Sequence, residues 1–159
     1  MTNIIISLWA FFILAFLGVI LFRIITKNYQ NYLFQNYDEV GIPYITLNVQ
    51  GQLLNLIVDS GAAVSIITQQ ALSSISYKSC LRKIELSATT SESIPADMVT
   101  IPININGREI QEDFVVHTVK DLANFEAQHG IVAHGILGNE FFTKTGCKID
   151  YAKHSVTLR

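Results

Sequence analysis

Cysteine is scarce in this 159-residue sequence, which contains only two, Cys80 and Cys147. They lie far apart and form no Cys-x-x-Cys pair, so a secreted fold held by a disulfide framework is not expected. A cysteine without a partner usually behaves as a small apolar residue, and we expect both to be buried thiols. A single disulfide between them stays open as the alternative.

An excess of charge of one sign is also lacking. The net charge is −2, and Lys and Arg form no cluster. Nucleic-acid binding domains carry basic patches, so the charge pattern favours no nucleic-acid partner. The four histidines show no metal-ligand spacing with cysteines or carboxylates. We therefore place them on the surface or in loops, and we expect neither a metal site nor a cofactor.

One long hydrophobic run is present, from Ile4 to Phe22, and its nineteen residues carry no charge. A helix of this length spans a hydrocarbon core of roughly 30 Å. A buried core helix would normally have a polar face, which this run lacks. A cleaved signal peptide would normally begin with basic residues and end at a small-x-small site, and neither is found. The run predicts a retained transmembrane helix, and we assign residues 1–27 to a membrane anchor.

The charges beside this helix bear on its orientation. Arg23 and Lys27 follow the helix, and positive residues tend to stay on the cytoplasmic side of a membrane. They favour a single-pass protein whose domain faces the cytoplasm. Residues 28–37 are rich in Tyr, Asn and Gln and suit a linker, with Tyr29 and Tyr32 near the lipid headgroups.

The remaining part, residues 38–159, has the pattern of an all-β domain. Short runs rich in β-branched residues are separated by turn residues at intervals of roughly 8–12 positions, which is typical of a compact barrel or sandwich. Asn106-Gly107 is a strong hairpin turn. Short helices are expected at 69–74 and 139–144. The strand candidates are 42–49, 53–58, 63–68, 84–88, 98–105, 108–116, 148–151 and 155–158.

Asp59 follows the apolar strand 53–58 and precedes Ser60, Gly61 and Ala62. A carboxylate at the end of a buried strand needs hydrogen-bond partners, and Ser60 offers a hydroxyl. Gly61 lets another chain approach its backbone closely, and Ala62 is too small to obstruct that approach. Asp-Ser-Gly is also ordinary turn chemistry, so a plain Asx-turn is the alternative. A surface turn would usually have polar flanks, whereas this one lies between two apolar strands.

A second unusual element lies further along, where Gly135-Ile136-Leu137-Gly138 places an apolar pair between two glycines. By itself it is also typical of a buried strand between tight bends. Together the two elements resemble the motifs of retropepsin-like aspartic proteases. Residues 56–62 (LIVDSGA) resemble the Asp-Thr/Ser-Gly-Ala motif. Residues 134–142 (HGILGNEFF) resemble the second motif, an apolar pair and a glycine followed by a short helix, and the ending from Ile149 is also similar.

The resemblance covers residues 37–159 and implies a closed β-barrel domain with one short C-terminal helix. It implies a homodimer with its site on the two-fold axis and a flap that closes over bound peptide. By position the flap would fall within 88–95, where an ordinary loop is equally compatible. The site residues implied are catalytic Asp59, the supporting Ser60, Gly61 and Ala62, the second-motif residues Ile136, Leu137 and Gly138, and the flap residues Thr90, Ser91 and Glu92.

Two departures from the family pattern are visible. The family often has Thr where Ser60 stands, and Ser keeps the hydroxyl that can bond across the dimer. Many members have Arg or Met and then Asp after the second-motif glycine, where this chain has Asn139-Glu140. A salt bridge made by that Arg would therefore be absent.

The chain carries one catalytic motif, because no other Asp is followed by Ser or Thr and then Gly. Aspartic protease chemistry needs two carboxylates about 3 Å apart. A second copy of the chain would supply its own Asp59 across a two-fold axis. We expect an aspartic endopeptidase that acts on polypeptides as a homodimer at a membrane. The alternatives are a catalytically silent, membrane-tethered peptide-binding or dimerisation domain of the same fold, and a small tethered β domain whose turn mimics the motif.

Overall fold

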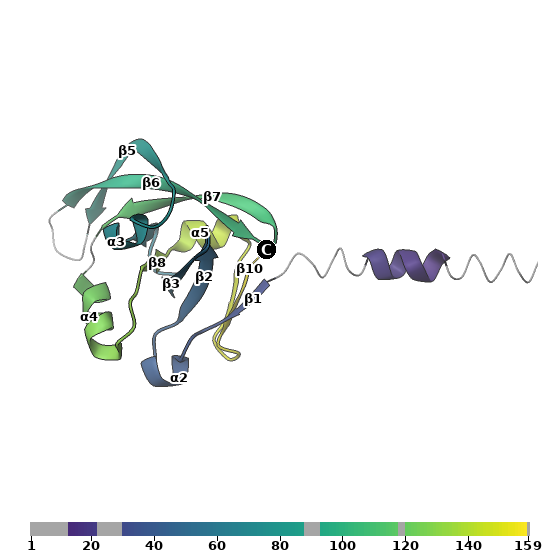
Figure 1. The fold of residues 1–159 in the computed structure, drawn as a ribbon. Helices are drawn as coiled ribbons and strands as arrows, with labels where there is room; N and C mark the ends of the chain where they lie inside the picture. The colour runs from purple at the N-terminus through teal and green to yellow at the C-terminus, as the bar shows by residue number, and fades with distance from the viewer. Residues whose placement is uncertain (1–12, 22–29, 88–92, 118–119, 159) are drawn as a thin grey trace, which may run out of the picture.

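The computed structural model describes residues 13–21, 30–87, 93–117 and 120–158. Its strands form two sheets, one of seven strands in the order β2-β3-β8-β4-β7-β6-β5 and one of three in the order β1-β10-β9 (Figure 1). The strands are β1 (Gln30–Leu33), β2 (Tyr44–Val49), β3 (Gln52–Val58), β4 (Ser65–Ile67), β5 (Lys78–Ser87), β6 (Ser93–Ile105), β7 (Arg108–Val116), β8 (Gly135–Leu137), β9 (Lys148–Asp150) and β10 (Ser155–Leu158). The helices between them are α2 (Tyr37–Val40), α3 (Gln69–Leu72), α4 (Lys120–His129) and α5 (Asn139–Lys144).

The two sheets share one apolar core. Val156 and Leu158 of the small sheet pack with Leu47, Leu56 and Ile101 of the large one in a single buried cluster. β2 and β5 are the edge strands of the large sheet, and no pairing joins these two edges in the described ranges. The all-β prediction is confirmed, whereas the predicted closure into a barrel is not.

Two hairpins of the large sheet turn through two residues each. Gln50 and Gly51 connect β2 to β3, and Asn106 and Gly107 connect β6 to β7, all four with positive φ between 55° and 88°. A type I′ turn requires positive φ at both central positions, and its twist matches that of the flanking strands. The hairpin predicted at Asn106-Gly107 is therefore confirmed, and it sets the pairing of β6 with β7.

The small sheet begins inside the segment that was predicted to be a linker. β1 pairs with β10 in antiparallel register, with Gln30 opposite Leu158. Tyr32 is half-buried against the core rather than free to reach lipid headgroups, and burial raises the pKa of its hydroxyl. α2 follows within the same stretch. The polar composition concealed this strand, because β1 buries little of its own surface and depends on pairing with the distant C-terminus.

Helix α4 was also absent from the sequence-based prediction. Its buried residues are Leu122 and Phe125, which pack with Tyr44 and Ala133 in a small cluster outside the main core. The rings of Tyr44 and Phe125 meet edge to face at a centroid distance of 5.9 Å. Two large apolar residues in ten make a weak helical pattern, so tertiary packing decides this helix.

The predicted membrane anchor, residues 1–27, lies mostly outside the described residues. Residues 13–21 form a helix with exposed apolar side chains, among them Leu14 at 70% and Phe16 at 67% exposure. Within the described ranges no helix combines the length and the apolar character needed to cross a membrane. The anchor therefore stays a prediction.

Phe34 directly follows β1, and its position predicts that docking of this segment contributes to stability. Its side chain is 6% exposed, and its N–H donates to the His154 carbonyl oxygen at 2.7 Å. We expect Phe34→Ala to lower the free energy of unfolding by about 3–5 kcal/mol, because it leaves a cavity in the core. The exposed neighbour Leu33, at 60% exposure, is the matched control. Chemical denaturation of Phe34→Ala and Leu33→Ala tests this. Equal losses in the free energy of unfolding would mean that the segment is not docked.

Candidate active site

Asp59 lies directly after β3, at the start of a tight loop. Its backbone N–H donates to the Leu137 carbonyl oxygen at 3.1 Å, and its carbonyl oxygen accepts from the Ala62 N–H at 3.2 Å. Its carboxylate oxygen Oδ1 accepts from the Gly61 N–H at 2.8 Å. The Asx-turn considered as an alternative is therefore part of the loop. Asp59, Ser60 and Gly61 are all exposed, so the loop presents the carboxylate at the surface.

The second motif lies against both arms of this loop. β8 runs parallel to β3 and antiparallel to β4, which places Ile136 opposite both Ile57 and Ile66. β3 leads into the Asp59 loop and β4 leaves it, so β8 fills the space between the two arms. The structure thus brings the residues of the two motifs together, although they lie far apart in the sequence.

The two glycines of the second motif permit this close approach. A Cβ on Gly135 would overlap the carbonyl oxygen of Ile66, and a Cβ on Gly138 would overlap that of Val64. In both cases the obstacle is backbone, which cannot rotate away. The spacing of an apolar pair between two glycines therefore has a steric cause at this site.

The start of α5 completes the support of the loop. The Asn139 N–H donates to the Ala62 carbonyl oxygen at 2.8 Å, and the Glu140 N–H donates to the Ala63 carbonyl oxygen at 3.3 Å. Together with the bond from Asp59 to Leu137, these contacts join the loop to one segment at both of its ends. The loop position is therefore determined by residues 137–140 rather than by its own turn alone.

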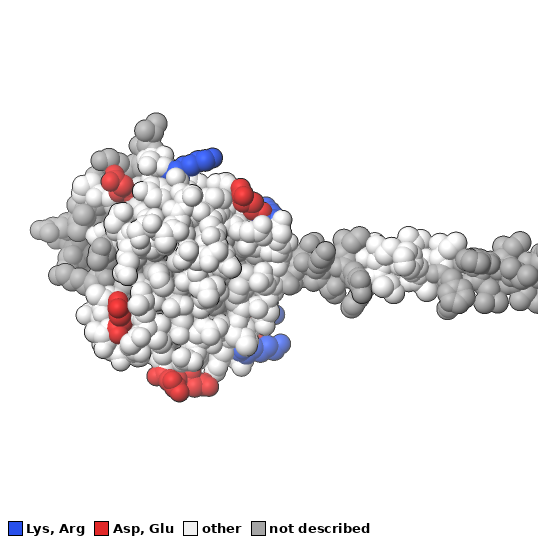
Figure 2. All heavy atoms as spheres, viewed as in Figure 1, with Lys and Arg blue, Asp and Glu red and all other residues white. Residues whose placement is uncertain are grey.

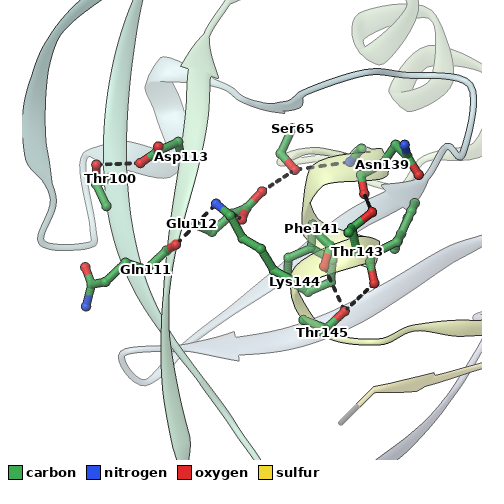
Figure 3. Close-up of polar contacts among 12 residues, drawn as sticks. Ser65, Thr100, Gln111, Glu112, Asp113, Asn139, Phe141, Thr143, Lys144 and Thr145 are labelled. Atoms are coloured by element: carbon green, nitrogen blue, oxygen red, sulfur yellow. Dashed lines mark hydrogen bonds and ion pairs between the residues drawn. The ribbon is translucent and has the colours of Figure 1, made fainter.

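A buried polar network lies behind this segment (Figure 3). Ser65 Oγ accepts from the Gly138 N–H at 3.1 Å and donates to Glu112 Oε1 at 2.9 Å. Lys144 Nζ lies 3.0 Å from Glu112 Oε2. Burial raises the pKa of the Glu112 carboxyl, and the bonds from Lys144 and Ser65 offset only part of that shift. The net direction for Lys144 is also a raised pKa, since the Glu112 carboxylate outweighs the effect of partial burial.

Sequence reasoning missed Glu112, although a signal was present. In β7 the residues that face the core are Ile110, Glu112 and Phe114, which alternate with more exposed ones. A charged residue at an apolar position of an alternating strand needs a buried partner. The partner Lys144 lies on α5, and nothing in the sequence pattern connects the two positions.

His134 was predicted to be a surface or loop histidine, and it does lie in the loop before β8, where it ties the second motif to β3. Its N–H donates to the Asn55 carbonyl oxygen at 2.8 Å, and its ring Nδ1 accepts from the Asn55 N–H at 3.0 Å. Burial lowers the pKa of the ring, which agrees with an unprotonated Nδ1 that accepts a hydrogen bond. This pair helps to hold β8 in register beside β3.

The predicted flap residues Thr90, Ser91 and Glu92 lie outside the described residues. The arms of the hairpin that precede and follow them are β5 and β6, which pair as far as Ser87 and Ser93.

Cys80 and Cys147 are both free thiols, and burial raises the pKa of Cys147 to about 11. Among the residues described, no group of three or more His, Cys, Asp and Glu side chains is placed to hold a metal ion. Acidic and basic side chains are scattered over the face shown in Figure 2, with no patch of one sign among its described residues.

Known proteins share the fold of this chain. The chain is similar in fold to a retropepsin-like aspartic protease from Rickettsia conorii, at 19% identity and a TM-score of 0.50, over 82% of this chain and 89% of that one. It also matches the EIAV protease, whose structure is a complex with the inhibitor HBY-793, at 18% identity and a TM-score of 0.49, over 73% and 99% of the two chains. No curated protein matches the sequence significantly.

The sequence profile of the retroviral aspartyl protease family matches residues 41–150, which is more than half of the chain. The chain therefore belongs to the retroviral aspartyl protease family.

Proposed function

We propose that the protein is an aspartic endopeptidase whose active site forms between two copies of the chain. The observation that carries this proposal is the exposed Asp59 carboxylate on a loop that residues 137–140 support at both ends. A carboxylate that only closed a surface turn would not need a second strand inserted behind it. Family membership supplies the reaction class, and the single motif in the chain supports the need for a partner copy.

The proposed chemistry uses Asp59 from each copy. Two carboxylates about 3 Å apart cannot both ionise easily, so the pair shares one proton. The ionised member takes a proton from a bound water as the water oxygen attacks the scissile carbonyl carbon. The protonated member donates its proton to the carbonyl oxygen. The tetrahedral intermediate then collapses, the C–N bond breaks, and the leaving nitrogen takes up a proton. No bond between enzyme and substrate forms.

The proposed substrate is an extended polypeptide. Peptides in this conformation bind through backbone hydrogen bonds to strand edges, and side-chain pockets set the preference. The β5–β6 hairpin has the position in the chain that the flap has in the family. A silent peptide-binding or dimerisation domain would need the same surfaces, but it would have no use for an aspartate at position 59.

We also propose that residues 1–27 anchor the protein in a membrane, with the domain on the cytoplasmic side. The support is the uncharged run from Ile4 to Phe22 and the two positive residues that follow it. Because β1 begins at Gln30, only residues 28–29 would separate the anchor from the folded domain. Such a short connection would hold the domain near the membrane and raise the local concentration of chains for pairing.

Replacing Asp59 tests the reaction class. We expect Asp59→Asn to reduce peptide cleavage by about 10²–10⁴-fold or more, because the pair loses its ionisable base. The fold should persist, since the amide still accepts from the Gly61 N–H. The full-length chain in detergent is incubated with a peptide library at acidic and neutral pH, and cleavage is followed by mass spectrometry. The control is Asp38→Asn, which changes an exposed carboxylate outside the site. If the parent and Asp59→Asn leave the library equally intact while both are folded dimers, the silent-domain alternative is favoured.

Mixing the two forms tests the shared site. When active chains and Asp59→Asn chains are mixed in equal amounts and allowed to exchange, about one quarter of the dimers contain two Asp59 residues. We expect the cleavage rate to fall to about that fraction of the rate of an all-active sample at the same total concentration. A fall to only one half would show that each chain is active alone.

Removal of the N-terminal segment tests the anchor. We expect the full-length chain to remain with lipid vesicles after alkaline washing and the chain lacking residues 1–27 to be released. Protease digestion of sealed cells or inside-out vesicles then identifies the side of the membrane. Release of the full-length chain by the alkaline wash would contradict a membrane-spanning anchor.

A further inference from the structure

The network of Ser65, Glu112 and Lys144 has features that a role in stability does not explain. Ser65 and Glu112 are both 0% exposed, whereas the Lys144 side chain is 39% exposed. A buried ion pair recovers little of the cost of removing its charges from water, and apolar residues of similar size are often at least as stabilising. The charge at position 112 therefore needs another explanation, and the contacts of Ser65 provide one.

The carboxylate of Glu112 determines which way the Ser65 hydroxyl points. A hydroxyl has one proton to donate and two lone pairs that accept, whereas an ionised carboxylate can only accept. The Ser65 proton must therefore go to Glu112 Oε1, 2.9 Å away, and a lone pair is left for the Gly138 N–H at 3.1 Å. Lys144 donates to the other carboxylate oxygen and favours the ionised form. The bond between Ser65 and Gly138 thus depends on the bond between Ser65 and Glu112. That bond in turn depends on Lys144, which favours the ionised carboxylate.

Gly138 is the end of the network and the centre of the loop support. The residue before it, Leu137, accepts the hydrogen bond of the Asp59 N–H. The residue after it, Asn139, donates to the Ala62 carbonyl oxygen. A displacement of Gly138 would therefore move both contacts of the Asp59 loop in the same direction. Gly138 also packs against the Val64 and Ala62 carbonyl oxygens without space for a side chain, so it has little freedom to compensate.

We propose that Ser65 and Glu112 are positioning residues for catalysis, which act through Gly138 to hold the Asp59 loop in its reactive geometry. Lys144 assists by keeping Glu112 ionised. Neither Ser65 nor Glu112 reaches the exposed carboxylate of Asp59. This inference rests on the proposed protease function. It adds Ser65 on β4 and Glu112 on β7 to the residues on which that function depends.

The test compares Ser65→Ala and Glu112→Gln with a core variant of similar cost. Ser65→Ala removes the acceptor of the Gly138 N–H. Glu112→Gln keeps the size of the side chain but introduces an amide that can donate to Ser65, so the direction of the hydroxyl is no longer imposed. The matched control is Ile103→Val, a change at a 1% exposed position of β6 in the same core. All are made in the full-length chain in detergent and studied well below the melting temperature of each variant.

Two measurements are made on each variant. We expect kcat for peptide cleavage to fall by about 10–100-fold in Ser65→Ala and Glu112→Gln with KM within about twofold, since displacement of a catalytic group by about 1 Å has effects of this size. The double variant should lose no more than the worse single one, because the bonds act in series. Hydrogen exchange of the Gly138 amide, followed by NMR, should speed up in both variants and stay unchanged in Ile103→Val.

The outcomes separate the inference from the proposed function. If both variants match Ile103→Val in kcat and in Gly138 exchange, the network is only structural and the inference is wrong. A rise in KM with unchanged kcat would also overturn it, since that would indicate substrate binding rather than positioning. If the parent chain cleaves no peptide, the proposed function fails. Gly138 exchange then decides alone whether Ser65 and Glu112 hold this segment.

Discussion

The insertion of β8 between β3 and β4 is the constraint on which the rest of the site depends. These two strands enter and leave the Asp59 loop, and β8 pairs with both of them. The insertion is possible only because Gly135 and Gly138 have no Cβ at points where the neighbouring backbone lies too close for one. Once β8 is in place, its carbonyl and the N–H groups that follow it become the hydrogen-bond partners of the loop. The exposed Asp59 carboxylate is thus held by backbone contacts whose geometry is set by the absence of two side chains.

The cost of the buried charge shows how closely the site and the core are connected. The pKa of Glu112 is higher in the folded chain than in water because burial disfavours its ionised form. Ionised Glu112 therefore reduces folding stability relative to its protonated form. This cost is absent below the pKa of the unfolded chain and complete above the folded pKa. The cost arises on β7, which pairs directly with β4 in the large sheet, and apolar residues at this position would pack without it. A buried polar group of this kind is explained more readily by the orientation it imposes than by the stability it adds.

The elements around the core extend the domain beyond the catalytic motifs. β1 starts at Gln30 and pairs with β10, so the chain enters the domain beside its own C-terminus. α4 covers the outer side of the strands that carry Ile57 and Ile136, and its aromatic contact with Tyr44 reaches the edge strand β2. α4 thus lies against strands that lead to the site, whereas β1 lies against the C-terminal strand. Both have few buried apolar residues of their own, which is why local patterns did not reveal them.

The sequence by itself determined the features that depend on local chemistry. Alternating strands, the Asn106-Gly107 turn, the family of the domain and the choice of Asp59 as the central carboxylate all follow from residues that lie close together in the chain. The tertiary structure decided what depends on distant partners. It paired β1 with the C-terminus, folded a weakly patterned segment into α4, and brought Lys144 to Glu112. It also left the large sheet open in the described ranges, where the family resemblance implied a closed barrel. The reason is physical: a turn or an alternating strand is set by the preferences of neighbouring residues, whereas a strand pairing or a buried charge is stable only when the completed fold supplies the other half.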